Sequence, residues 1–292
     1  MFLIVGGDSE IGAAAYRLMK ARGMPVAATT RRHERVAPDR PLLDLGASLD
    51  DWQPPEPVTA ACICAALPRL AACAADPEGT ARINVDQTGL LIDKLLARGI
   101  SVLFLSSNQV FDGRKPHVAA DAPHSPASEY GRQKARAETA LQGHMARGAP
   151  AAVLRLAKVV SAGMPLIEGW VADLSAAKPI RAFHDMTLAP VPTGLVCVAI
   201  LSLLQHRAAG VFQLTGPRDV TYADIGRFLA AYLGAEASLI RETSAREAGM
   251  PAGATPLHTT LDSSLLRERY GLEAPDVWEV FSDIMSNLGQ RT

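Results

Sequence analysis

The chain has 292 residues, of which 48% are hydrophobic and 20% charged, and its 29 basic and 30 acidic residues give a net charge of -1 at pH 7. This balanced composition is typical of a globular protein and excludes a broad basic surface for nucleic acid or an anionic membrane. The length allows one large α/β domain or a nucleotide-binding domain with a smaller partner.

The amino terminus predicts a buried strand and not a targeting signal. Residues 2–5 are apolar, no positive charge precedes them, and a glycine-rich turn follows at once. No segment reaches the ~18 uncharged apolar residues of a membrane span. We therefore expect a cytoplasmic protein. The four cysteines lack the paired spacing of a zinc site, so we expect reduced core thiols and no metal.

Residues 6–12, Gly-Gly-Asp-Ser-Glu-Ile-Gly, separate this strand from a helix predicted to reach about Arg22. Strand, glycine-rich turn and helix form a cradle for a dinucleotide, because glycines let the backbone approach the pyrophosphate and the helix amino terminus supplies N–H donors. An ordinary tight turn is the alternative. Serine stands at the middle glycine position, where it either approaches the phosphates or caps the helix. The residues assigned to this cradle are Gly6, Ser9, Glu10, Ile11 and Gly12.

The end of the second predicted strand, residues 25–30, indicates which nicotinamide cofactor binds. An NAD site places an acid there for the ribose hydroxyls, whereas an NADP site places arginine there for the 2′-phosphate. This chain has Thr30, Arg31 and Arg32, with no acid before Glu34. The sequence therefore favours NADP(H) over NAD(H), although a solvated basic turn would look the same.

Further apolar runs predict strands over residues 42–45, 58–66 and 102–105, and a long helix over residues 77–98. The third strand would bring Asp44 and Leu45 near the adenine. The run over residues 102–105 ends in serines, at the edge of the sheet where α/β proteins bind ligands.

Tyr130 and Lys134 follow on a predicted helix, four residues apart and therefore on one face. A lysine ammonium one turn away is expected to lower the pKa of a phenol from about 10, and Ser107 could hold a reacting oxygen beside it. This arrangement suits proton transfer to a carbonyl oxygen. A lone Tyr-x-x-x-Lys pair is more often a solvated helix face, but here a serine-ended strand and a nucleotide loop accompany it.

Strands and helices alternate through residue 156, which predicts an α/β fold of the Rossmann type, a doubly wound parallel sheet. We expect an NAD(P)-binding domain over residues 1–158, to which residues 190–215 return. A smaller substrate-binding region is expected over residues 159–292. Helices are expected over residues 193–206, between the Thr221 cap and Gly234, and twice within residues 262–287.

These motifs resemble the extended short-chain dehydrogenase/reductase family, and the resemblance covers essentially the whole chain. Residues 106–113, Ser-Ser-Asn-Gln-Val-Phe-Asp-Gly, are similar to the Ser-Thr-Asp-Tyr-Val-Phe-Asp-Gly of its dTDP-4-dehydrorhamnose reductase branch. Further matches are Arg-Ile-Asn-Val from residue 82 and Tyr-Gly-Arg-Gln-Lys from residue 130. The resemblance implies an NAD(P) cofactor and a nucleotide sugar as substrate.

The resemblance also implies roles for single residues. Ser107 would hold the carbonyl, Tyr130 would donate the proton, and Lys134 would tune the phenol and bind the nicotinamide ribose. The other residues that it implies are Ala65, Ala66 and Asn84 for the cofactor, and Asn108, His184 and Asp185 for the substrate. The chain departs from the family pattern at Cys64, Pro68, Arg69 and Lys158, which leaves the sugar open.

The favoured function is an NADPH-dependent reductase of a keto-sugar nucleotide in polysaccharide biosynthesis, with hydride from the cofactor and a proton from Tyr130. Two alternatives stay open: a sugar-nucleotide 4-epimerase that retains its NAD, and a non-catalytic NADP-binding sensor or regulatory subunit. The expected partners are a small-molecule substrate and a second copy of the chain in a homodimer, and not nucleic acid or a membrane.

Overall fold

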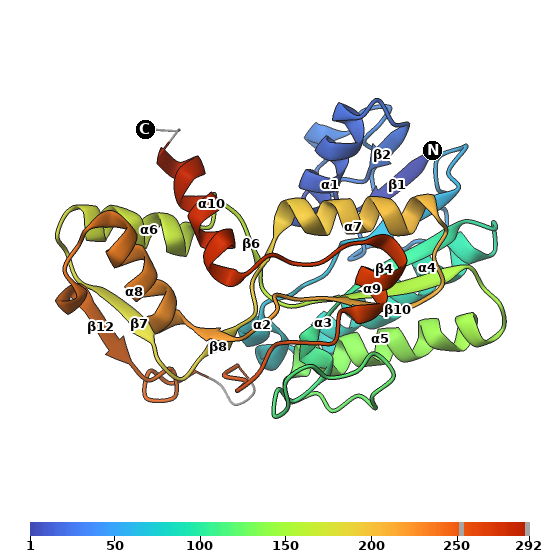
Figure 1. Cartoon of the computed structure of the whole chain (residues 1–292). Helices are drawn as coiled ribbons and strands as arrows, with labels where there is room; N and C mark the ends of the chain where they lie inside the picture. The colour runs from blue at the N-terminus through green and yellow to red at the C-terminus, as the bar shows by residue number, and fades with distance from the viewer. Residues whose placement is uncertain (251–253, 290–292) are drawn as a thin grey trace.

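Six parallel strands form the central sheet of the computed structural model, which describes residues 1–250 and 254–289 (Figure 1). The strand order is β10-β5-β4-β3-β1-β2, which confirms the predicted doubly wound α/β class. The strands are β1 (Phe2–Val5), β2 (Val26–Ala28), β3 (Ala60–Ile63), β4 (Ser101–Ser107), β5 (Ala151–Leu156) and β10 (Gly210–Leu214). Their runs of β-branched and other apolar residues are buried on both faces, as a parallel sheet requires.

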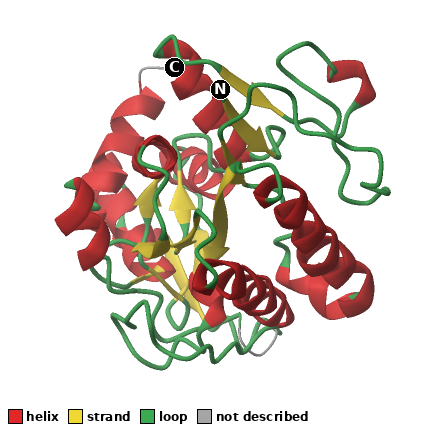
Figure 2. Cartoon of the chain, turned by 90° about the vertical axis from the view of Figure 1, so that its right-hand side faces the viewer, coloured by secondary structure: helices red, strands yellow, loops and turns green. Residues whose placement is uncertain are grey.

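Helices cover both faces of this sheet (Figure 2). On one face α1 (Glu10–Ala21) packs beside α7 (Thr193–Gln205), and on the other α4 (Thr88–Leu96) packs beside α5 (Glu129–Ala146). The predicted helix over residues 77–98 forms as α3 (Pro77–Ala81), a π-helical turn (Arg82–Gln87) and α4. A short helix, α2 (Leu70–Ala75), precedes it.

The prediction of a third strand over residues 42–45 is wrong. This segment makes only a single β-bridge, between Thr30 and Leu42, although Leu43 and Leu45 are buried. Pro41 cannot donate a hydrogen bond, and the carboxylate of Asp44 accepts one from the backbone N–H of Gly46, which turns the chain away. Apolar side chains therefore reach the core from a loop.

A smaller lobe lies beside the carboxyl ends of the strands (Figure 1). Its core is made by α6 (Pro165–Ser175), α8 (Tyr222–Leu233) and α10 (Val277–Gly289). Three strand pairs accompany them: β7 (Ile180–Phe183) with β12 (Ile240–Thr243), β8 (Thr187–Leu188) with β11 (Val220–Thr221), and β6 (Val159–Val160) with β9 (Val191–Pro192). As predicted, Thr221 caps α8 through a capping box and Gly234 ends it in the left-handed conformation.

The chain passes between the two lobes repeatedly. After β9 it returns to the sheet as α7 and β10, and after the small lobe it returns again before α9 (Ser264–Tyr270). On this last passage the backbone N–H of His258 donates to the carbonyl of Gly113 at 2.8 Å, and Val118 bridges to Leu261. The loop after β4 is therefore held by the carboxyl-terminal segment.

Candidate cofactor and active site

The glycine loop after β1 has no room for side chains at Gly6, Gly7 or Gly12. A Cβ on Gly6 would lie 2.7 Å from the backbone nitrogen of Ala65, and one on Gly12 would lie 2.3 Å from the carbonyl oxygen of Gly6. Gly6 also has a positive φ of 89°. Ser9 is the amino-terminal cap of α1, because its Oγ accepts from the N–H of Gly12 at 3.1 Å and donates to the carbonyl of Gly6 at 2.7 Å. The loop is thus a rigid cradle directly against the end of β3.

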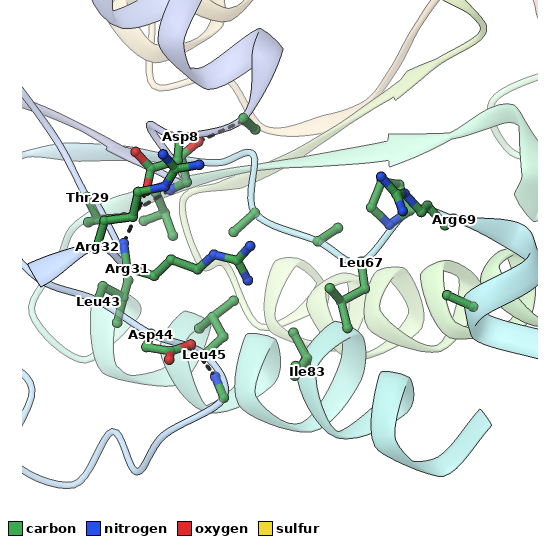
Figure 3. A pocket seen from close by; sticks show the side chains of 18 residues that line it. Asp8, Thr29, Arg31, Arg32, Leu43, Asp44, Leu45, Leu67, Arg69 and Ile83 are labelled. Atoms are coloured by element: carbon green, nitrogen blue, oxygen red, sulfur yellow. Dashed lines mark hydrogen bonds between the residues drawn. The ribbon is translucent and has the colours of Figure 1, made fainter. Parts of the chain in front are cut away.

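A cavity of about 590 Å³ opens beside this loop at the carboxyl ends of the strands (Figure 3). Eight of the predicted cofactor residues line it: Gly6, Ser9, Arg31, Arg32, Asp44, Leu45, Ala65 and Ala66. Six others do not: Glu10, Ile11 and Gly12 belong to α1, and Thr30, Asn84 and Lys134 are buried. Glu10 accepts a hydrogen bond from Ser161 at 2.8 Å.

A carboxylate that the sequence did not single out lies where the second strand ends. Asp8 accepts hydrogen bonds from Thr30 Oγ1 at 2.7 Å and from the backbone N–H of Arg31 at 3.2 Å. Arg40 Nη2 and Arg35 Nη1 lie 3.1 and 3.6 Å from the same carboxylate. Burial opposes ionisation, but the hydrogen bonds from Thr30 and Arg31 and the charges of Arg40 and Arg32 outweigh it and lower the pKa of Asp8. An acid therefore does lie at the end of β2, although it comes from the glycine loop and not from the residues that follow the strand. Two guanidinium groups pair with it.

Asn84 supports the opposite wall of the cavity. It is buried in the π-helical turn, where it accepts from the N–H of Leu67 at 2.7 Å and donates to the carbonyl of Leu67 at 3.0 Å. It also donates to Gln133 at 2.8 Å, which links it to α5. π-helical turns are often found at functional sites. Asn84 therefore fixes the backbone after β3 and does not face the cavity itself.

The end of β4 and the start of α5 lie in direct contact. A Cβ on Gly131 would lie 2.1 Å from the carbonyl oxygen of Gln109, so glycine is needed at that position. Ser128 caps α5 and donates a hydrogen bond to the side chain of Gln109 at 3.1 Å. This close packing places Tyr130 on α5 beside the segment that begins with Ser107, far from it in sequence.

Lys134 is fully inside the protein and holds α5 against β4. Its Nζ donates to the carbonyl of Leu105 at 2.8 Å and lies 5.9 Å from the ring centroid of Tyr130. Burial lowers the pKa of Lys134 to about 8, and the charge of Glu138 opposes that effect. The ammonium is therefore close to its titration range at neutral pH.

The expectation that Lys134 lowers the pKa of Tyr130 is wrong for this geometry. Burial raises the pKa of Tyr130, and Cys73 adds to the effect, because the phenol loses solvent while the nearest ammonium is directed to a carbonyl. The phenol therefore stays protonated across the neutral range.

A buried ion pair lies one turn further along α5. Glu138 accepts from Arg155 Nη2 at 2.7 Å and from His124 at 3.0 Å, and neither the carboxylate nor the guanidinium is more than 1% exposed. Arg155 also donates to Gln213 on β10 and to the carbonyl of Ala120. This network joins α5, β5, β10 and the loop after β4.

The predicted substrate residues are spread over both lobes. Asn108 follows Ser107 and accepts a hydrogen bond from its hydroxyl at 3.3 Å. His184 follows β7, and its backbone N–H donates to the carbonyl of Thr243. The carboxylate of Asp185 accepts a hydrogen bond from Ser244 Oγ at 2.5 Å. Within residues 1–250 and 254–289, neither His184 nor Asp185 bonds to Ser107, Tyr130 or Lys134. Asp185 stabilises its own loop.

No group of three or more potential metal ligands occurs in the described part of the chain, and no helix there is long and apolar enough to cross a membrane. The described cysteines form no disulfide.

The RmlD substrate binding domain family matches residues 1–289 of the chain. A probable low-salt glycan biosynthesis reductase of Haloferax volcanii is 27% identical in an alignment of 291 residues that covers 93% of this chain and 93% of that one. The dTDP-4-keto-6-deoxy-D-glucose reductase of Streptomyces niveus is 28% identical over 281 residues, 95% of this chain and 89% of that one. A solved structure of dTDP-4-dehydrorhamnose reductase from Bacillus anthracis, in complex with NADP, superposes with a TM-score of 0.81 at 15% identity, over 100% of this chain and 99% of that one.

Proposed function

The chain belongs to the RmlD substrate binding domain family, and on that premise we propose that it is an NADPH-dependent reductase of a keto-sugar nucleotide. The contact between the β4 end and the start of α5 carries this proposal, since it packs the helix that bears Tyr130 and Lys134 against the segment that begins with Ser107. This contact lies at the carboxyl end of β4, the same edge of the parallel sheet at which the nucleotide-sized cavity opens. The names of the two full-length relatives, both reductases, support the same activity.

The residues present fit a nicotinamide cofactor. The cradle excludes any Cβ at Gly6 and Gly12, as a close backbone approach to a pyrophosphate requires. Arg31 and Arg32 line the end of the cavity where a 2′-phosphate would lie, and Asp8 beside them is already paired with Arg40. This pairing supports NADP over NAD, because the carboxylate is not free to repel the phosphate.

Three side chains would carry the reaction. Tyr130 would donate its phenolic proton to the carbonyl oxygen, and Ser107 would hold that oxygen by a hydrogen bond. Lys134 gives one N–H to Leu105 and has two left for the hydroxyls of the nicotinamide ribose. The bound cofactor would supply the hydride. The substrate's nucleotide would lie toward the small lobe, with Asn108, His184 and Asp185 as its candidate contacts.

The decisive experiment incubates the purified protein with NADPH and a panel of keto-sugar nucleotides and follows the loss of reduced-cofactor absorbance. Stoichiometric oxidation of NADPH with formation of the reduced sugar supports the proposal. Interconversion of two sugar nucleotides without net oxidation would instead identify an epimerase. Binding of NADP with no turnover on any member of the panel would favour the regulatory alternative.

A further inference from the structure

A third arginine lines the cofactor cavity, and nothing in the predicted site uses it. Arg69 follows β3 and precedes α2, at the far side of the cavity from Arg31 and Arg32 (Figure 3). Its side chain is exposed and makes no ion pair or hydrogen bond to any residue within 1–250 and 254–289. A guanidinium in a ligand-sized cavity without a protein partner is available for an anion.

The backbone that carries Arg69 is held on two sides. Ala65, at the start of this segment, lies against the glycine loop so closely that a Cβ on Gly6 would come within 2.9 Å of its Cβ. Leu67 is fixed by both hydrogen bonds of Asn84, at 2.7 and 3.0 Å. Arg69 therefore starts from a fixed point next to the pyrophosphate cradle.

Two acidic residues near the glycine loop favour an additional cation beside a bound pyrophosphate. Glu10 lies in the first turn of α1, at the helix end whose N–H groups face the cradle, and Asp8 lies in the glycine loop. Arg35 and Arg40 compensate Asp8 at the β2 side, but among the described residues only the Ser161 hydroxyl binds the carboxylate of Glu10. A pyrophosphate carries two negative charges, and a carboxylate at the helix amino terminus weakens the attraction of the helix dipole.

We propose that Arg69 binds the pyrophosphate of the cofactor on the side nearer the nicotinamide, opposite the glycine loop. Arg31 and Arg32 lie at one end of the cavity and Arg69 at the other. Arg31 and Arg32 would therefore bind the 2′-phosphate, and Arg69 would bind the pyrophosphate. This inference rests on the proposed cofactor-binding function. It also gives a role to a residue at which the chain departs from the family pattern.

Calorimetric titration tests the proposal without any substrate. Arg69→Gln should weaken NADP⁺ binding by about 10- to 100-fold, the range expected for a charge-assisted hydrogen bond. It should change the affinity for 2′,5′-ADP, which lacks the nicotinamide-side phosphate, by less than about threefold. Arg69→Lys should recover part of the loss, and Arg22→Gln, an exposed arginine at the far end of α1, should change nothing. A thermal melt of each variant confirms that it is folded.

Unchanged NADP⁺ affinity in Arg69→Gln would overturn this assignment while leaving the proposed reductase intact. An unchanged NADP⁺ affinity with a raised KM for the nucleotide sugar would likewise overturn it and assign Arg69 to the substrate's diphosphate. Failure of the unmodified protein to bind NADP⁺ or NADPH at all would overturn both the inference and the proposed function.

Discussion

The Nζ of Lys134 lies 2.8 Å from the carbonyl oxygen of Leu105, so a buried hydrogen bond fastens the helix that bears Tyr130 to the strand that ends in Ser107. One turn later Glu138 binds Arg155, whose strand position is directly opposite Ser106. Two buried charges on one helix face thus set the position of α5 on the sheet. A change at Lys134 should therefore alter both geometry and charge at the site.

Lys134→Met should weaken NADPH binding and lower turnover. In the unmodified protein the ammonium loses its proton as the pH rises through about 8, so kcat/KM should be constant below that pH and fall above it. Rates from pH 6 to 10 check this, and the variant should lack the fall. Lys20→Met, which removes an exposed lysine on α1, is the control and should keep the fall. A profile of the unmodified protein that stays flat to pH 10 would contradict the role of Lys134.

Tyr130→Phe should lower turnover by about 10² to 10⁴, the usual contribution of general acid-base catalysis, with little effect on NADPH affinity. Because burial raises the pKa of Tyr130, the phenol stays protonated in the neutral range and is ready to donate. Steady-state kinetics and a cofactor titration measure both quantities. Tyr232→Phe, at an exposed tyrosine on α8, should be neutral. Full activity in Tyr130→Phe would place the proton donor elsewhere.

Replacement of Arg31 and Arg32 by alanine together should reduce the preference for NADPH over NADH from about tenfold or more to near one. The loss should fall on NADPH alone, since these side chains are assigned to the 2′-phosphate. Fluorescence titration with both reduced cofactors measures the ratio. The test fails for this assignment if the unmodified protein binds the two cofactors equally well.

Arg155→Met should destabilise the fold by roughly 3 to 5 kcal/mol, because it leaves the carboxylate of Glu138 buried without its main partner. Denaturant unfolding measures the change. The double variant Arg155→Met with Glu138→Leu should recover much of the loss, since apolar replacement of both partners of a buried pair is often neutral. If the single variant were as stable as the unmodified protein, the pair would not hold α5 on the sheet.

The same pair predicts how stability depends on acid. Burial opposes ionisation of Glu138, but the bonds from His124 and Arg155 outweigh it and lower its folded-state pKa below the ordinary value of 4.5. This contribution is therefore complete above pH 4.5 and is lost as the pH falls through the folded-state pKa. Unfolding free energies from pH 7 to pH 3 should decline less in Glu138→Gln than in the unmodified protein.

Local sequence signals predicted most of the fold. Apolar runs located the strands, and the capping residue Thr221 located the start of α8, because both signals act between neighbours in the chain. For Ser9 the sequence left two roles open, and the structure shows that it caps α1. The segment at residues 42–45 looked like a strand, since apolar side chains enter the core equally well from a loop. Pro41 before the segment and the turn formed by Asp44 prevent it from pairing as a strand.

The parts of the site that the sequence missed depend on distant contacts. Asp8 meets Arg40 across 32 positions, and no spacing rule connects an acid in a glycine loop with an arginine so far away. Arg69 reached notice only as a departure from a family pattern. The direction of the Tyr130 pKa shift was wrong because four-residue spacing gives proximity to Lys134 and says nothing about burial or about where the ammonium donates.

Neither lobe is one continuous piece of chain. β10 pairs with β5, and α7 covers the sheet with fully buried residues such as Ile200, yet both are made after the chain has already entered the small lobe. A fragment that stops at residue 158 would leave the edge of β5 unpaired, and unpaired edges promote association between copies. Grafting a different small lobe onto this sheet would therefore require exchange of several separate stretches and could not be achieved at a single junction.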